Sequence, residues 1–298
     1  MGDYANYGRD LFRAAGFVYI AIIVIAIGLA LWLPKGKIAK AIAACIVIAL
    51  ASILPIQGLQ EIRAQQAKAD EFKQRYDKAK ALFDERCKRA GEKIYRTVEG
   101  VEGILLVNPR PERGHGERAD RDWIGAGFPH ESGGNQYIME FLYFNEPASG
   151  NRGRELGWIR KGIQGYPYVD IEEQGQHFRY RLVAQSEYKN LSDPVKDYGS
   201  KEIVTTDYPR YTVTYDNIPD PEGRANWVAG GRVSVVDRAT NELLGEFIRY
   251  AFEPGLGNTG GMRSPWGFAG QCPVPNDGGG PGDIRSFVEQ VLKPKQGK

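Results

Sequence analysis

Residue types suited to metal binding or acid–base chemistry gather in one polar, glycine-rich segment, residues 109–135. Imidazole and carboxylate groups are ordinary zinc ligands. Their spacing here matches no zinc or calcium signature, and the same segment is rich in arginine. We therefore predict no bound metal. The residues kept as weak metal candidates are His115, Asp120, Asp122 and His130.

The sequence also carries no convincing motif for catalysis or for cofactor binding. The stretch from Gly255 to Gly260 has the letters of a dinucleotide fingerprint, but Pro265 follows closely, where the phosphate-binding helix should run. The chain has no phosphate-binding loop and no nucleophile elbow. We expect no catalytic residue and no cofactor, and a non-enzyme is favoured. A membrane-tethered hydrolase that uses the 109–135 segment is kept as an alternative.

Two of the three cysteines, Cys87 and Cys272, lie outside the apolar N-terminal region. An even pair of cysteines in an exported domain commonly forms a disulfide. We predict a Cys87–Cys272 disulfide that fastens the glycine-rich tail to the end of a long helix. Cys45 lies inside an apolar run and is expected to be a small membrane-helix residue.

Aromatic and arginine side chains are the usual anchors of protein interfaces. In this chain they occur in loop-like segments, and we select Trp123, Arg121 and Trp266 as partner-binding candidates. The alternative for each tryptophan is that it fills a core short of aliphatic side chains.

Two long uncharged runs occupy residues 14–34 and 41–60. A membrane-spanning helix needs about 20 predominantly apolar residues, and backbone groups in lipid must bond within the segment. We predict an N-terminal tail over 1–13 and a transmembrane helical hairpin over 14–60, with the lipid bilayer as a partner.

The distribution of basic residues indicates which side of the membrane each part of the chain faces. Counting Lys and Arg near the spans gives four on the side of the termini and three in the connecting loop, which decides nothing. The loop concentrates its charge in Lys35, Lys37 and Lys40, with no acidic residue, so we place it in the cytoplasm. The remainder of the chain would then face the periplasm from a bacterial inner membrane. A cytoplasm-facing membrane adaptor is the alternative.

Residues 61–91 consist mainly of helix-forming types and predict a stalk helix that ends before Gly91. A narrow apolar stripe recurs every seven residues, at Ile62, Ala69, Tyr76, Phe83 and Ala90. Such a stripe serves either self-association, which would make a homo-oligomer, or packing on the following domain. We expect packing near Phe83 and exposure near the membrane.

The pattern then changes to a period of two, which predicts an antiparallel β-rich domain over 92–252. Strands are expected at 93–98, 103–108, 136–144, 168–173, 177–184, 202–206, 210–215, 231–237 and 242–252. The run 136–144 is apolar at almost every position and is expected to be a central strand. Asp220 and Pro221 should open a short helical turn. A glycine- and proline-rich tail over 253–298 ends in an amphipathic helix at 283–293. The predicted fold is thus a membrane-anchored α+β chain.

The charge balance excludes one class of partner. Beyond residue 56 the chain carries 34 basic and 35 acidic residues, without a basic stripe, so nucleic acid is not expected to bind. We expect an inner-membrane-anchored envelope protein whose β-rich domain binds another protein or envelope component, as an accessory subunit or immunity-type factor.

Overall fold

The computed structural model describes residues 2–112, 120, 122–142, 165–182, 199–254, 265–275 and 283–295. It divides the chain into two compact units, residues 1–74 and 75–298. Because the boundary falls inside one long helix, residues 75–87 of that helix belong to the second unit.

The first unit contains α1 (Gly2–Trp32) and the larger part of α2 (Lys37–Cys87). The hydroxyl of Tyr19 on α1 donates to the backbone carbonyl of Ala51 on α2. By length and composition α2 could cross a membrane, and its apolar window is not buried within the chain. The apolar part of α1, Gly16–Trp32, is shorter. A second span and a transmembrane hairpin therefore stay predictions.

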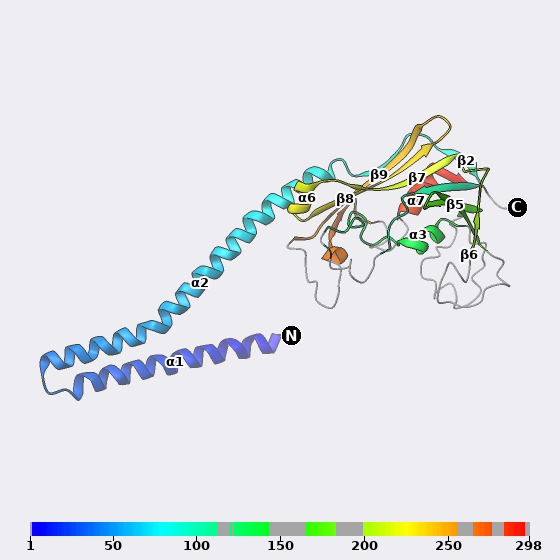
Figure 1. Ribbon diagram of the computed structural model, residues 1–298. Coiled ribbons are helices and arrows are strands. Elements are labelled where there is room, and N and C mark those ends of the chain that lie inside the picture. Colours follow the sequence, from blue (N-terminus) through cyan, green and yellow to red (C-terminus); the bar gives the residue numbers. More distant parts are fainter. Residues whose placement is uncertain are drawn as a thin grey trace. The chain divides into compact units, whose positions relative to one another are not determined.

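The second unit is built on a nine-stranded sheet (Figure 1). Its strands, in spatial order, are β1 (Gly91–Ile94), β9 (Glu242–Phe252), β8 (Val228–Asp237), β7 (Tyr211–Ile218), β3 (Gly103–Val107), β4 (Tyr168–Glu173), β5 (Gln176–Leu182) and β6 (Gly199–Ile203). A ninth strand, β10 (Gly270–Cys272), also pairs with β9. A separate ladder joins β2 (Val98–Val101) to β11 (Leu292–Pro294).

The sheet is mixed, so the antiparallel prediction is wrong in its centre. Strand β3 pairs in parallel with both β4 and β7. β3 is thereby buried between two neighbours, and the continuous apolar run of 103–107 is typical of a parallel strand covered on both faces. The outer pairs, β4 with β5, β7 with β8 and β8 with β9, are antiparallel as expected.

The expected strand at 136–144 is also wrong, because α3 (Gly134–Glu140) occupies its first five residues and only Leu142 makes an isolated β-bridge among the described ones. Tyr137, Ile138 and Met139 are consecutive and all buried. A short apolar run buried on every side has no period that separates a strand from a helix. The short helix opened by Asp220 is confirmed as α6 (Pro221–Ala225), with the Asp220 carboxylate accepting from the Gly223 amide. The amphipathic C-terminal helix is confirmed as α7 (Asp283–Val291).

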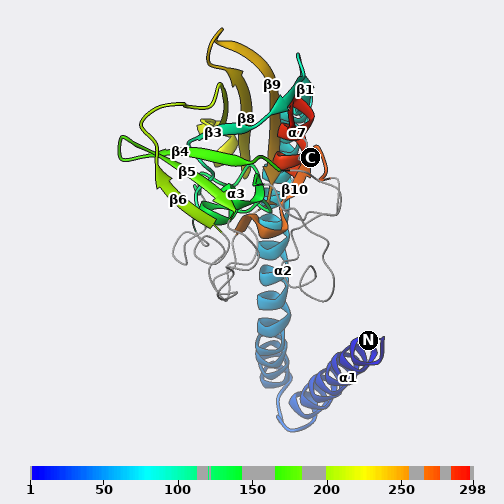
Figure 2. The ribbon, with the colours of Figure 1, turned by 90° about the vertical axis from the view of Figure 1, so that its right-hand side faces the viewer.

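The two faces of the sheet are covered by different elements. On one face, α7 and α3 close the main core, to which Phe247 and Phe287 contribute a tilted ring pair with centroids 5.6 Å apart. On the other face, the last three turns of α2 pack on β8 and β9. Figure 2 shows β4, β5 and β6 turned away from β8 and β9, as expected for a strongly twisted sheet.

The stripe of α2 makes the contact predicted for it at the domain end. Phe83 is buried and stacks on Phe252 of β9, with ring centroids 5.3 Å apart. Tyr76 approaches the same ring at 5.7 Å. Ala79 is fully buried in the same cluster. The stripe therefore serves packing within the second unit over residues 76–87.

We predict that Phe83→Ala lowers the free energy of unfolding of this unit by about 3–4 kcal/mol, because it leaves a cavity beside Phe252. Urea unfolding followed by tryptophan fluorescence measures it. Phe72→Ala in the same helix is the control, since Phe72 is 50% exposed, and should cost less than about 1 kcal/mol. Equal losses for the two variants would contradict the packing argument.

Candidate functional site

The end of α2 is joined to the sheet by charge as well as by apolar packing. The guanidinium of Arg86 donates to the Asp220 carboxylate over 2.9 Å, and this pair links α2 to the cap of α6. The Arg75 guanidinium lies 4.2 Å from the centre of the Trp227 ring and donates to the Ala225 carbonyl. Both ends of the packed helix segment are therefore fixed to the same β7–β8 connection.

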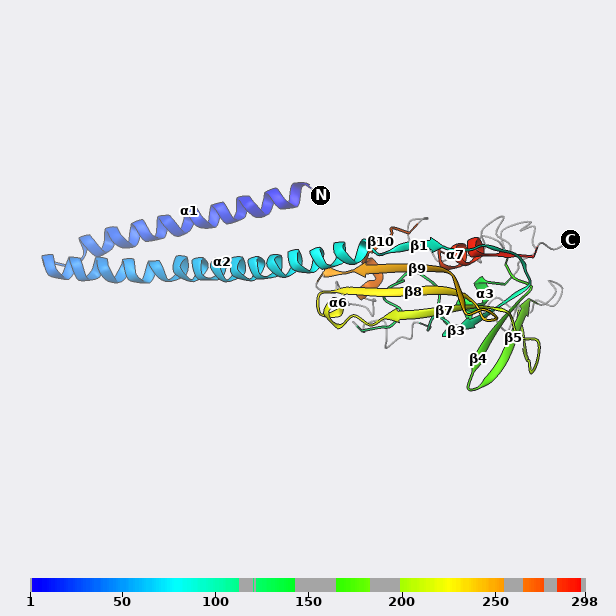
Figure 3. The same cartoon turned by 90° about the horizontal axis from the view of Figure 1, so that it is seen from above.

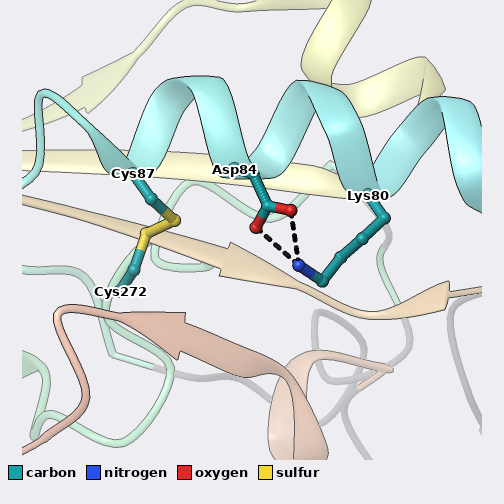
Figure 4. Close-up of a disulfide and its surroundings, with 4 residues drawn as sticks. All are labelled: Lys80, Asp84, Cys87 and Cys272. Carbon is teal, nitrogen blue, oxygen red and sulfur yellow. Dashed lines mark hydrogen bonds and ion pairs between the residues drawn. A yellow bond between two sulfur atoms is a disulfide. The ribbon is translucent and has the colours of Figure 1, made fainter.

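Cys87 and Cys272 lie at disulfide distance at this junction, with their sulfur atoms 1.93 Å and their Cα atoms 5.6 Å apart (Figure 4). Cys87 is the last residue of α2, and Cys272 is the last residue of β10. Both residues are half-buried. The pair connects positions 185 residues apart in the sequence. Cys45 is the remaining cysteine and is exposed within the first unit.

The weak metal candidates do not form a cluster in the described part of the chain. His115 lies outside the described residues. The Asp120 carboxylate accepts from the backbone amide of Asp122, so it stabilises a local turn, and both residues are exposed. His130 is half-buried. Among the described residues no three His, Cys, Asp or Glu side chains lie close enough to hold a metal ion.

The structure places the two candidate tryptophans in the core of the second unit. Trp123 is 3% exposed and Trp266 is 0% exposed, and both pack with Ala229 and Ala251 of β8 and β9. Their buried rings stabilise the fold and do not present a surface to a partner. Arg121 lies outside the described residues. Among the described residues of the tail, the large exposed apolar side chains are Phe268 and Val274, at 69% and 76% exposure.

The segment that carried the chemical candidates is organised by a buried arginine. Arg110 is 1% exposed, and its guanidinium donates to the backbone carbonyls of Gly125, Phe128 and Ser132. The same guanidinium lies over the Trp123 ring at 4.9 Å. A charged group that satisfies three carbonyls shapes the loop around itself. Arg110 therefore acts as a scaffold for the described residues 122–132.

Two buried carboxyl groups connect this loop to other elements. Glu131 accepts from the backbone amides of Asp283 and Ile284, the first two residues of α7. The first amides of a helix have no acceptor within the helix, and a carboxylate at this position accepts their hydrogen bonds. Its negative charge also interacts favourably with the positive end of the helix dipole. The Asp283 carboxylate in turn receives the guanidinium of Arg249 over 2.7 Å. Arg249 lies over the rings of Phe128 and Phe247.

Glu140, on α3, is a buried carboxyl group whose pKa is strongly shifted. Burial raises its pKa to about 8, and the nearby charge of Glu131 acts in the same direction. The Ser132 hydroxyl donates to its carboxyl oxygen and partly opposes this shift. Burial also raises the pKa of Tyr137 well above its ordinary value. Near pH 7 this region thus contains a carboxyl group that holds its proton.

This shift predicts a pH-dependent stability with a defined sign. The folded chain keeps a proton on Glu140 that the unfolded chain, with an ordinary carboxyl pKa of 4.5, releases. The stabilisation is complete below about pH 4.5 and is lost as pH rises toward 8. Glu140→Gln keeps a neutral group at this position. We expect it to match the parent near pH 5 and to exceed it at pH 8.5 by roughly 2–4 kcal/mol.

Urea midpoints measured from pH 5 to 8.5 test this expectation. Glu99→Gln is the control, because Glu99 is an exposed carboxylate paired with Lys293. It should leave the slope of stability with pH unchanged over this range. Parallel curves for Glu140→Gln and its parent would show that Glu140 is ionised in the folded chain.

A close backbone contact seats this loop on the sheet. A Cβ atom on Gly127 would lie 2.2 Å from the backbone nitrogen of Gly231 in β8 and 2.4 Å from the carbonyl carbon of Gly230. Gly231 in turn faces the ring of Phe128 at a position where a Cβ would be 2.7 Å away. Glycine is therefore required on both sides of the contact.

We predict that Gly127→Ala destabilises the second unit by at least about 2 kcal/mol, because backbone atoms cannot move aside as a flexible side chain can. Thermal unfolding of the purified protein measures the loss. Gly267→Ala is the matched control, since nothing lies within 4 Å of its Cβ position, and should stay within about 0.5 kcal/mol of the parent. A neutral Gly127→Ala would mean that the loop does not rest on β8.

Sequence reasoning missed Arg110, Glu140 and Arg249, and it missed the contacts of Glu131 and Asp283, which it had named as a loop carboxylate and a helix cap. One signal was available, because adjacent glycines inside a strand, here Gly230 and Gly231, indicate that another backbone comes close. Nothing local marked the contacts of these charged residues, since most of their partners lie far away in the sequence.

Comparison with protein-family models, with curated proteins and with solved structures finds no match to this chain.

Proposed function

We propose that this chain is anchored in a bacterial inner membrane by its apolar N-terminal helices and displays the β-rich unit in the periplasm as a binding module. The observation that carries the proposal is the combination of an unburied apolar helix and a distant cysteine pair at disulfide distance. Disulfides persist in oxidising compartments and are rare in the cytosol. A hairpin anchor with Lys35, Lys37 and Lys40 in a cytoplasmic loop agrees with this orientation.

Binding to another protein or envelope component is supported by the described surface. Phe268 and Val274 are large exposed apolar side chains on either side of the three-residue strand β10. The buried Trp266 holds this segment at one end, and the cysteine pair holds it at β10. A surface that is ordered in advance loses less conformational entropy when it binds. An accessory subunit or immunity-type factor would use such a surface.

The hydrolase alternative finds no specific support in the described part of the 109–135 segment. Arg110, Phe128 and Glu131 are buried and bonded to backbone groups or packed in the core. These contacts maintain the fold. The adaptor alternative, with the β-rich unit in the cytoplasm, differs from the proposal in its compartment and is separated from it by the following experiment.

We expect alkaline phosphatase fused after residue 298 to be active, because the enzyme folds only where disulfides form. In the same cells, thiol labelling of denatured, unreduced full-length protein should modify one cysteine, Cys45. An inactive phosphatase fusion together with a fluorescent cytoplasmic reporter would overturn the proposed orientation. Three labelled cysteines would show that the disulfide is absent and would remove the main support for the periplasmic orientation. A photoreactive residue at position 268 should give a discrete adduct in native membranes that one at position 243 does not.

A further inference from the structure

The edge of β9 is closed by two segments that are distant in the sequence. Strand β10 pairs with residues 250–252 of β9, and β1 pairs with residues 245–248. Both lie on the same side of β9 (Figure 3). Both run antiparallel to β9, so they form one composite edge strand interrupted opposite Arg249. At this interruption α2 has just ended in Cys87 and β10 ends in Cys272.

Besides the cysteine bond, strand β10 is held by its short pairing with β9 and by packing of Cys272 against the cluster under α2. It is three residues long and pairs with one neighbour. Pro273 follows directly and has no amide with which to extend the pairing. The side-chain oxygen of Gln271 is buried without a hydrogen-bond donor among the described residues. Such an unsatisfied oxygen weakens a short strand further.

The elements on either side of β10 are held independently of the cysteine pair. Trp266 is fully buried and Ala269 is 7% exposed in a separate apolar cluster. The side chains of Tyr250 and Phe252 pack under α2, where Phe83 and Tyr76 hold the Phe252 ring. Loss of β10 would consequently leave β9, α2 and residues 265–269 in place. Within the described part of the tail, the opening would affect residues 270–275.

We propose that the Cys87–Cys272 disulfide is a redox latch that keeps β10 on the β9 edge and that a dithiol reductant opens. A thiolate of the reductant attacks one sulfur, forms a mixed disulfide and releases the other cysteine as a thiolate. The second thiol of the reductant then closes its own disulfide and frees the second cysteine. Two electrons and two protons pass to the protein. Both cysteines are half-buried, so the bond is not fully enclosed by the fold.

The opened latch would expose specific backbone groups. The Glu253 amide donates to Trp227 on the β8 side of the sheet. Because amides alternate along a strand, those of Tyr250 and Phe252 point to β10, and that of Ala251 points to β8. An edge with unpaired amides and carbonyls is a template for an incoming strand. The latch therefore controls whether this edge is closed or able to accept a strand.

Residue-resolved amide hydrogen exchange on the full chain in detergent micelles tests the latch. The samples carry Cys45→Ala so that one cysteine pair can react, and are compared oxidised and after dithiothreitol. We expect exchange at Tyr250 and Phe252 to accelerate at least about tenfold on reduction, while Ala251 stays protected as an internal control. A variant with Cys87→Ser and Cys272→Ser should match the reduced state and should not respond to dithiothreitol.

Two results would overturn the latch. Unchanged exchange at Tyr250 and Phe252 after reduction would show that β10 holds without the disulfide. Equal acceleration at Ala251 would show that reduction unfolds β9, so that the bond is a general staple. The latch needs the bond but no particular compartment, and protein oxidised after purification tests it. Its failure is therefore separate from failure of the proposed orientation.

Discussion

Strand β9 must be buried on both faces and closed on both edges, and the arrangement of the second unit follows from this requirement. Its side chains alternate between the ring cluster under α2 and the core under α7. Strand β8 covers one edge, and the other is shared by β1 and β10. Segments from residues 76 to 291 are thereby held together by one eleven-residue strand. The end of α2 is fixed by its packing on this strand and by the contacts of Arg75 and Arg86 with the β7–β8 connection.

The second unit also depends on buried charged groups on the side of the sheet that α7 covers. A buried carboxylate, Glu131, takes the first amides of α7, while Asp283 takes Arg249 from β9. Ionised groups in this position stabilise the fold only when each has its partner, because removing one leaves the other desolvated. Glu140 avoids the cost of burying a charge in another way, because it keeps its proton and stays neutral. The core therefore contains buried carboxyl groups of two kinds, ionised ones with a partner and a neutral one.

Much of this fold could be predicted from local patterns. Strands 168–173 and 242–252, the cap at Asp220 and the helix at 283 were marked by alternation and by capping residues, which act over a few positions. The run at 136–144 could not be assigned, because apolar residues on every side have no period. The parallel pairs of β3 depend on which distant strands become neighbours. The buried site residues were hidden for the same reason, since Glu131 and Asp283 meet across 152 positions.

The C-terminal helix has a consequence for the order in which the protein is made. Ile284, Phe287, Val288 and Val291 complete the main core, and the Tyr166 hydroxyl donates to the carbonyl of Leu292. These residues are synthesised after every strand of the main sheet. Until they emerge, α7 cannot cover its part of this sheet face, so the core of the unit stays incomplete. A chain that stalls before residue 283 would present an open apolar sheet face, which is a substrate for chaperones and proteases.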